Sequence, residues 1–566
     1  MKAHRLQSEK GIVTIIALIM VGMLTLIGLA ALSTSDDEVS IAGNELQEMR
    51  AFYAAEAGLE RAAADLQAQY EATGVPPTVM PVGADTLNKC RVAYRTDDDG
   101  APTQRILTTG TLAGLHALVK SFTISALGVQ PGDNSRVALT QSFETALVPI
   151  FQFAVFYGND LEIAPGPDMT LIGRVHSNGN LWLQAGNTLT MDSYVTASGE
   201  ILHGRKGAGG VSNGDVRIKD AAGNYQSMTA SGAADTDGDG WLTHQDTTWY
   251  NESVSRWNGR VQDGAHGQGE LNLPLTNVDD PHKIIERGDS NPDSYEHKAT
   301  LKFIDGQALQ KVGGLWVDVT ANMIADGVIT VTEDKFYDQR ENEWVDCTDL
   351  DVGALYDNGY APENGVVYFS DEVSGSGDWP ALRLNNGEEL DAALTIASEN
   401  PLYTLGDFNS VDKKPAAIMG DAVTFLSGNF DDALSTNDKS DRQATETTVN
   451  ASYLTGNTET TDDNYNGGFE NLPRFLEVWS GRDFNWSGSA VNLWYSEQAD
   501  GDWSGSYYSP PNRNWSYDTD LDDPNKLPPE TPVVRVFQRT GWRHVNVGYA
   551  DAAENFDWTL GDAITD

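Results

Sequence analysis

The longest run of apolar positions lies at residues 12–32, where no charged residue interrupts the sequence. About 20 apolar residues in a helix are enough to span the hydrocarbon core of a bilayer. Lys2, Arg5 and Lys10 precede the run, and basic flanks favour the cytoplasmic side. A secretory signal would have a shorter apolar region and a small-residue cleavage site. The pattern therefore predicts a membrane helix, with the acidic remainder of the chain outside the cytoplasm.

A helical pattern continues beyond this run to about Tyr70, and no proline interrupts it. Positions near helical spacing are occupied by Val39, Ala42, Leu46, Met49, Tyr53, Glu56, Leu59, Ala63 and Leu66. One helix from Ile12 to Tyr70 would be about 90 Å long at a rise of 1.5 Å per residue. Since no single soluble core buries that length, we expect a rod that moves from a bilayer into a bundle of similar rods.

Strand-like alternation follows from Cys90 to about Tyr157, in four runs separated by turn signals. Four strands after a long helix predict a small sheet that packs on the second half of that helix. We therefore expect a transmembrane helix at residues 12–70 and a small sheet at residues 71–157.

At Gly158 the pattern of apolar and polar residues changes to very short strands separated by Gly, Asn and Asp. The same pattern occurs again after Trp379. Such runs are typical of a β-solenoid or a sandwich, and no fixed repeat length is evident. The expected fold is a long N-terminal helix that forms an α+β unit with the small sheet, followed by a mostly β ectodomain. We divide this ectodomain into a β-helix-like domain (158–203 and 378–449), an inserted β-rich lobe (204–377) and an aromatic-rich C-terminal β region (450–566).

Residues 5–61 resemble the class III leaders and helices of type IV pilins and type II secretion pseudopilins. A short basic leader, residues 1–11, ends in Gly11 directly before the apolar run. The segment AGNELQEMRAFYAAEAGLERA, residues 42–62, is similar to the N-terminal signature of PilX-like minor pilins. The resemblance implies cleavage by a prepilin peptidase between Gly11 and Ile12, methylation of the new N-terminus, and assembly with other pilins through the helix at residues 12–70. It also implies that the α+β unit is pilin-like, with a pilin-like sheet at residues 71–157.

Two positions depart from the pattern of the major pilins. Ile12 replaces the usual Phe or Met at mature position one, and Ile16 stands where major pilins have Glu. In the family, that Glu is thought to pair with the N-terminal amine of the neighbouring subunit. Its absence favours a minor subunit, with the filament tip as one candidate position, over a filament repeat. An anchored ectodomain with an uncleaved signal anchor is the simpler alternative.

The acidic composition narrows the classes of partner. The formal net charge is −46 over 566 residues, and nucleic-acid binding requires basic patches, so we exclude nucleic acid as a partner. A chain of this length holds more than one core, and we expect two or three domains after the helix. The two cysteines, Cys90 and Cys347, are compatible either with a disulfide outside the cytoplasm or with two free buried thiols.

The sharpest local motif is DTDGDGWLTHQD, residues 235–246. Asp235, Asp237 and Asp239 occupy loop positions 1, 3 and 5, Trp241 offers a carbonyl at position 7, and Asp246 closes the loop at position 12. The loop resembles those of EF-hands and dockerins, with Asp at position 12 as in dockerins. It predicts a calcium site that rigidifies the inserted lobe, and a plain acidic turn is the alternative.

Other motifs give weaker signals. The sequence has no HExxH, GxSxG or phosphate-binding glycine loop, so we predict no catalytic residues. His176 is interpreted as a hydrogen-bonded turn residue, and the RGDS sequence at residues 287–290 as a chance match to an integrin-recognition motif. The C-terminal tryptophans could form a sugar-stacking platform, although such residues more often fill a β-rich core.

The sequence thus predicts a minor type IV pilin-like subunit rather than an enzyme. It would enter the inner membrane and then the pilus or cell surface, where a calcium-binding ectodomain primes assembly, adheres to a surface or glycan ligand, or does both. Two alternatives stay open. One is a membrane-anchored β-helix enzyme acting on polysaccharide, with paired carboxylates about 5 to 9.5 Å apart. The other is an anchored surface-binding module with no filament role.

Overall fold

The chain divides into two compact units, each described here by itself. The computed structural model describes residues 9–130, 135–207, 210–275, 280–373, 377, 379–461 and 464–545. The first unit comprises Met1–Pro102, Lys120–Thr145 and Phe537–Asp566, and the second comprises Thr103–Val119 and Ala146–Val536. The sequence-based expectation of a long helix followed by a mostly β ectodomain is confirmed, while the finer domain boundaries stay predictions.

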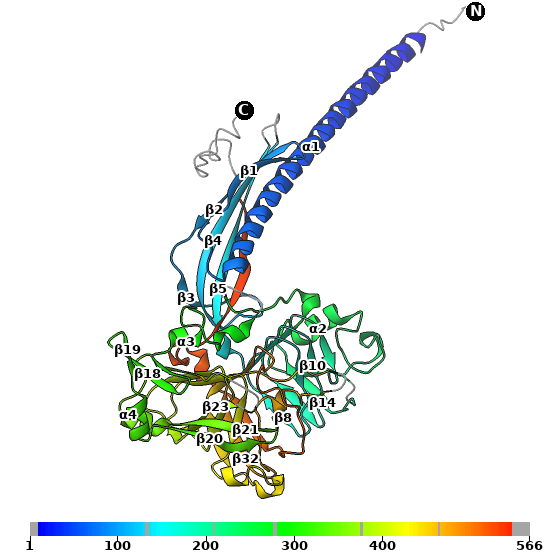
Figure 1. Cartoon of the computed structure of the whole chain (residues 1–566). Coiled ribbons are helices and arrows are strands. Elements are labelled where there is room, and N and C mark those ends of the chain that lie inside the picture. Colours follow the sequence, from blue (N-terminus) through cyan, green and yellow to red (C-terminus); the bar gives the residue numbers. More distant parts are fainter. Residues whose placement is uncertain are drawn as a thin grey trace, which may run out of the picture. The chain divides into compact units, whose positions relative to one another are not determined.

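Helix α1 (Glu9–Thr73) is a single uninterrupted helix of 65 residues, coloured blue in Figure 1. At 1.5 Å per residue it is about 100 Å long. It ends because Gly74 adopts a left-handed conformation (φ +67°) and donates its N–H to the carbonyl of Tyr70, an arrangement that terminates many helices. Pro76 and Pro77 follow and cannot continue the helical hydrogen bonding.

In the first unit, the second half of α1 packs on a sheet with the strand order β1-β2-β4-β5-β35. The strands are β1 (Val82–Leu87), β2 (Cys90–Asp98), β4 (His116–Val129), β5 (Arg136–Pro149) and β35 (Val533–Val545), and β3 (Thr103–Ile106) pairs with the first residues of β4. The core joins helix residues such as Ala55, Leu59 and Leu66 to Phe122 and Phe143 of the sheet. Strand β35 comes from the region that sequence analysis placed at the C-terminal end.

The buried face of α1 contains only some of the residues at helical spacing that the sequence analysis expected on one side of the helix. Leu59, Ala63 and Leu66 are buried, but Tyr53 remains 60% exposed, and Met49 also lies on the open side. Small side chains on the sheet-facing side, such as Ala51 and Ala55, are fully buried. They let the helix approach the sheet closely, so the bulkier stripe members are left for other contacts.

The second unit is built from stacked parallel strands. Sheet β13-β10-β7 pairs Ile201, Leu181 and Leu161, which are 20 residues apart in sequence and fully buried. This sheet contains β7 (Leu161–Ile163), β10 (Leu181–Leu183) and β13 (Ile201–His203). A second stack contains β8 (Met169–Leu171), β11 (Thr188–Met191), β14 (Asp215–Lys219) and β15 (Tyr225–Ser227). The chain therefore returns to the same register after each turn in this stretch.

A 12-stranded sheet runs through the second unit. In order, it contains β16 (Val261–Gln262), β12 (Val195–Ala197), β9 (Val175–Ser177), β6 (Val155–Tyr157), β33 (Ala490–Asn492), β31 (Ser452–Thr455), β28 (Ala416–Gly420), β25 (Leu394–Ser398), β22 (Val366–Ser370), β17 (Leu301–Ile304), β18 (Gln307–Val312) and β19 (Leu315–Asp318). The parallel pair β6–β33 joins the stretch that begins at Val155 to the later strands. Residues 204–377, expected as an inserted lobe, contribute strands to this same sheet.

Two five-stranded sheets complete this unit. One contains β20 (Ile329–Asp338), β21 (Glu343–Asp351), β23 (Pro380–Asn385), β26 (Leu402–Leu405) and β29 (Val423–Leu426). The other contains β24 (Gly387–Glu389), β27 (Phe408–Val411), β30 (Thr447–Asn450), β32 (Asp483–Gly488) and β34 (Asn512–Tyr517). Four short helices connect strands: α2 (Trp249–Trp257), α3 (Tyr295–Lys298), α4 (Thr320–Ala325) and α5 (Val352–Asp357).

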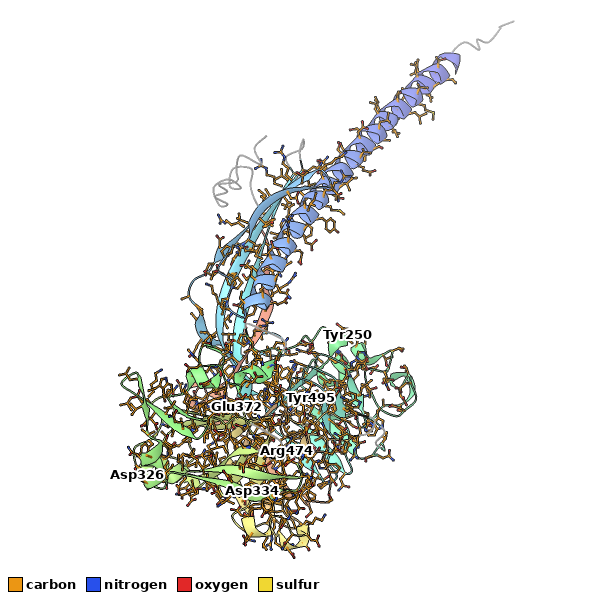
Figure 2. All side chains as sticks on the ribbon, in the orientation of Figure 1. Tyr250, Asp326, Asp334, Glu372, Arg474 and Tyr495 are labelled. Atoms are coloured by element: carbon orange, nitrogen blue, oxygen red, sulfur yellow. The ribbon has the colours of Figure 1, made fainter. Side chains whose placement is uncertain are left out.

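Buried charge in the second unit is paired. Arg474, labelled in Figure 2, lies 2.7 Å from Glu341, and it donates to the carbonyl of Ala499 at 2.7 Å. Both side chains of the ion pair are almost fully buried, so each supplies the partner that a charge needs away from water. The pair links three loops that are far apart in sequence.

Candidate functional sites

The first half of α1 is an apolar surface that the fold leaves uncovered. The helix from Gly11 is long and apolar enough to cross a membrane, with a mean hydropathy of 2.8 and no buried residue in its most apolar window. Gly11 and Ile12, the expected processing site, lie near the start of this helix, and Ile16 is exposed a turn later. An uncovered apolar rod of this length requires lipid or other helices around it.

The structure brings together the first three acidic residues of the expected calcium loop. Carboxylate oxygens of Asp235, Asp237 and Asp239 lie within 4.8 Å of one another. Asp246 is buried instead against the loop backbone, where it accepts hydrogen bonds from the N–H groups of Thr236 at 2.6 Å and Thr243 at 3.0 Å. Asp246 thus holds the two ends of the loop together.

The remaining geometry of this loop is compatible with a cation. Gly240, at loop position 6, has φ +89°, which supplies the sharp turn there. Trp241 forms a β-bridge with Thr229 that uses the carbonyls of Gly240 and Met228 and not the carbonyl of Trp241. Partial burial and the charges of Asp237 and Asp246 raise the pKa of Asp239. Carboxylates held this close favour a bound cation that would relieve their repulsion.

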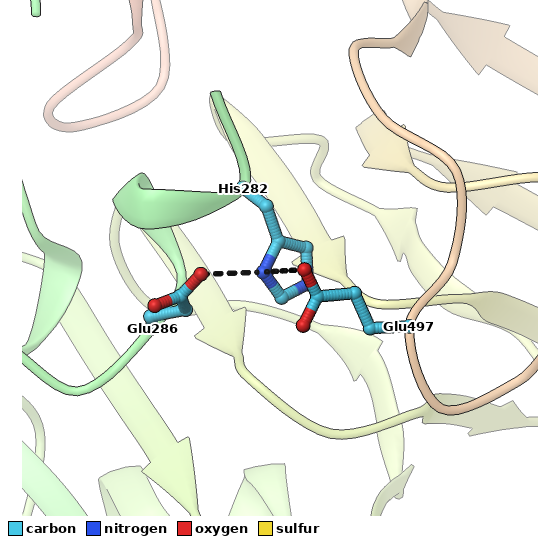
Figure 3. Close-up of side chains that lie close together, drawn as sticks. All are labelled: His282, Glu286 and Glu497. Carbon is cyan, nitrogen blue, oxygen red and sulfur yellow. Dashed lines mark hydrogen bonds and ion pairs between the residues drawn. The ribbon is translucent and has the colours of Figure 1, made fainter. Parts of the chain in front are cut away.

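A second cluster was not recognised from sequence. It consists of His282 and Glu286 near one short turn and Glu497 from a distant loop (Figure 3). Burial alone would lower the pKa of His282, but the carboxylates of Asp421, Glu286 and Glu497 outweigh that effect and raise it to about 9. Sequence offers only the spacing of His282 and Glu286 as a signal, because Glu497 joins them through the fold.

Two buried carboxyl groups bear on the enzymatic alternative. Burial raises the pKa of Glu470 to about 7 and also raises the pKa of Glu162, which accepts a hydrogen bond from Tyr465 at 2.5 Å. The cavity lined by Glu162 has a volume of about 10 Å³. That volume is about the size of one water probe, so the cavity that Glu162 lines is too small for a sugar ring.

The other candidate residues are held by contacts within the fold. His176 is fully buried on β9, where its Nδ1 lies 2.8 Å from Thr196 and its Nε2 lies 2.9 Å from Asn178. In the RGDS sequence, the guanidinium of Arg287 contacts Asp305 and Ser370 and is held within the fold. Both cysteines are free buried thiols, and no disulfide joins them.

The C-terminal tryptophans mainly fill the core. Trp479, Trp486 and Trp494 are buried, and Trp503 and Trp515 pack against the same apolar interior. Trp542 is exposed on β35 of the first unit, and Trp558 lies outside the described residues. In the described part of the chain, the C-terminal tryptophans of the second unit therefore form no exposed row.

Comparison with known proteins decides the nature of the N-terminal helix. The PilX N-terminal family matches residues 10–60. Residues 10–60, the PilX segment, are similar to the PilX N-terminal domain. This segment covers the apolar half of α1 and the start of its sheet-packed half, and over it the chain resembles type IV minor pilins. It points to a structural subunit that associates with other pilins and is anchored in a membrane before assembly.

Two other comparisons add little beyond the PilX segment. No curated protein sequence matches the chain. Among solved structures, the competence-associated pilin ComZ from Thermus thermophilus aligns over 88% of this chain and 98% of its own, with 13% identity and a TM-score of 0.28. A TM-score of this size does not establish a common fold.

Proposed function

We propose that the protein is a minor subunit of a type IV pilus or pseudopilus. In this proposal, a prepilin peptidase cuts between Gly11 and Ile12, and α1 holds the subunit in the inner membrane until it enters the filament. The ectodomain then stands at the filament or cell surface, where it primes assembly or adheres to a surface. One observation carries the proposal: within a single helix, an uncovered apolar half continues into a half packed on its own sheet.

The exposed part of α1 beyond the apolar run gives the sharpest test. Leu46 lies in the PilX segment and is exposed, so Leu46→Glu should leave the fold and the membrane anchor intact while disrupting packing against neighbouring helices. Val331→Glu, at an exposed position on β20, is the matched control. Sheared filaments from a host with a type IV pilus system should contain the wild type and the Val331 variant and lack the Leu46 variant. Recovery of none of them would contradict the filament role, and equal recovery of all three would contradict packing of the helix through Leu46.

We also propose that the loop at residues 235–246 binds calcium. The support is the approach of the three carboxylates of Asp235, Asp237 and Asp239, together with the turn at Gly240. Calcium takes oxygen ligands at about 2.3 to 2.6 Å, and three carboxylates this close need only small side-chain movements to reach one ion. Bound calcium would fix the loop between β15 and α2 and would supply no chemistry beyond rigidity.

A further inference from the structure

The cluster around His282 lies in the second unit, apart from the PilX segment and the acidic loop. His282 is on the short turn Pro281–Ile284, and its side chain is only 3% exposed. Its Nδ1 lies 3.1 Å from Oε1 of Glu286 and 3.7 Å from Oε1 of Glu497 (Figure 3). One imidazole nitrogen and two carboxylate oxygens, from segments more than 200 residues apart, therefore converge on one point.

These distances are close to the separation between two ligand atoms that bind the same metal ion. Zinc binds His nitrogen at about 2.0 to 2.1 Å and carboxylate oxygen at about 2.0 to 2.2 Å in tetrahedral geometry. Two ligands of such a sphere lie about 3.4 Å apart. The separations of 3.1 and 3.7 Å from Nδ1 bracket that value, so an ion needs little rearrangement to be bound.

The far side of the imidazole ring is held in the manner typical of metal-binding histidines. Nε2 faces Oδ1 of Asp421 at 3.5 Å. Asp421 is fully buried, and it accepts backbone N–H groups from Glu497 at 2.6 Å and Ala499 at 2.8 Å. A carboxylate behind the ring favours the tautomer with hydrogen on Nε2, although Nε2 makes no close hydrogen bond to it in this structure, and that tautomer leaves the Nδ1 lone pair for a metal. The same Asp421 also orders the loop that presents Glu497.

Charge and space also favour an ion here. Three carboxylates, from Glu286, Glu497 and Asp421, surround the single imidazole. Lys283 pairs with Glu286, and it also lies 3.5 Å from Asp280. A cavity of about 500 Å³ adjoins the cluster and is lined in part by His282, Trp494 and Glu497. A fourth coordination position would open into this cavity, where water or a ligand oxygen could occupy it.

We propose that His282, Glu286 and Glu497 bind a divalent transition-metal ion of the zinc type at the wall of this cavity. The imidazole ligand separates this site from the all-oxygen calcium loop, since calcium and magnesium take oxygen ligands. The ion clips the turn at residues 281–286 to the loop that carries Glu497. A histidine ligand must be neutral, so the ion takes the place of any proton on Nδ1, and that proton goes to solvent.

The test is a zinc titration of tag-free, detergent-solubilised full-length protein that has been stripped with a chelator. Excess calcium keeps the loop at residues 235–246 occupied. Calorimetry should show one zinc ion per chain, and Glu497→Gln should weaken binding at least tenfold. Glu497 is 59% exposed, so this substitution should not unfold the protein, and Glu388→Gln at another exposed carboxyl is the matched control. In the wild type, cobalt should give visible absorption bands typical of a low-symmetry site.

Three results would overturn the proposal. They are the absence of stoichiometric zinc binding in calcium, unchanged affinity in the Glu497 variant, and equal weakening by the Glu388 substitution. Zinc bound by scattered surface histidines would be recognised by the second result, because such binding does not depend on Glu497. His282→Gln, compared by thermal unfolding with and without zinc, gives a second measurement: the zinc-dependent rise in Tm should be present in the wild type and lost in this variant.

Discussion

A Cβ atom on Gly128 would lie 1.9 Å from the carbonyl oxygen of Ala51. The backbone of β4 therefore touches the backbone of α1 with no side chain between them. Gly58 makes a similar approach from the helix side, since a Cβ there would lie 2.6 Å from a methyl group of Val92. This contact fixes how closely the helix lies on its sheet, and the fold of the first unit depends on it.

The first prediction is that Gly128→Ala destabilises the first unit. The added methyl group would clash with backbone and not with a flexible side chain, so the helix must shift, at a cost of about 1 to 3 kcal/mol. Thermal unfolding and limited proteolysis of the purified chain measure the effect. Gly43→Ala is the control, because Gly43 lies in α1 and a Cβ added there would have open space around it. Equal stability of both variants would show that the contact is not tight in solution.

The second prediction concerns processing. Gly11→Val places a branched side chain at the expected cleavage position and should leave the leader attached in a host with a prepilin peptidase. Gly22→Val makes the same change further along the apolar run. A Cβ added at Gly22 would have no atom from beyond the local helix within 4 Å, so processing should proceed. Intact mass of the membrane-bound protein distinguishes the two forms. Cleavage in both variants would place the cut elsewhere, and cleavage in neither would show that the loss of processing is not specific to Gly11.

The third prediction concerns pH. Glu470 has a folded pKa of about 7 because of burial, above its ordinary value near 4.5, so the folded state holds the proton more tightly than the unfolded state. Its stabilising contribution is complete below about pH 4.5 and is lost as pH rises through 7, a change of about 3 kcal/mol. In Glu470→Gln, Tm should fall less between pH 5 and pH 8 than in the wild type. The exposed Glu388→Gln should behave like the wild type, and identical pH profiles for all three proteins would refute the assignment.

The fourth prediction is that calcium binding depends on the carboxylate cluster. Asp239→Asn removes one charge but keeps the oxygen that accepts the N–H of Trp241 at 2.7 Å, so the loop should stay folded. Calcium affinity measured by calorimetry should weaken roughly tenfold or more, because loop affinity follows the number of charged ligands. Asp334→Asn, at an acidic residue with φ +48° that asparagine tolerates, should bind as the wild type does. Weak, equal binding in all forms would favour the plain acidic turn.

Local patterns predicted the helix well and the long-range arrangement poorly. The uninterrupted apolar and amphipathic sequence from Ile12 to Tyr70 was enough to predict α1, because helical periodicity is a local property. The repeat that aligns Leu161, Leu181 and Ile201 was missed, since each strand has only three residues and the sequences between them differ. Strand β35 was also unpredictable, because its partner β5 lies almost 400 residues earlier.

The candidate sites divide in the same way. Asp235, Asp237 and Asp239 follow one another closely, so their approach could be predicted from a loop motif. The approach of Glu497 to His282 depends on the position of β33, which precedes the loop, and on the hydrogen bond that Asp421 accepts from the N–H of Glu497. No spacing in the sequence predicts this approach. Asp246, expected as the closing ligand, stays a prediction, and its oxygens accept backbone hydrogen bonds that the motif does not report.

The most direct test of the filament role is the N-terminus of the protein recovered from sheared surface filaments, read by intact mass and N-terminal sequencing. A processed chain that begins at N-methylated Ile12 in the filament fraction is the predicted result. A chain that keeps its leader and is found only in membranes would contradict the account, and would favour an anchored ectodomain that takes no part in a filament.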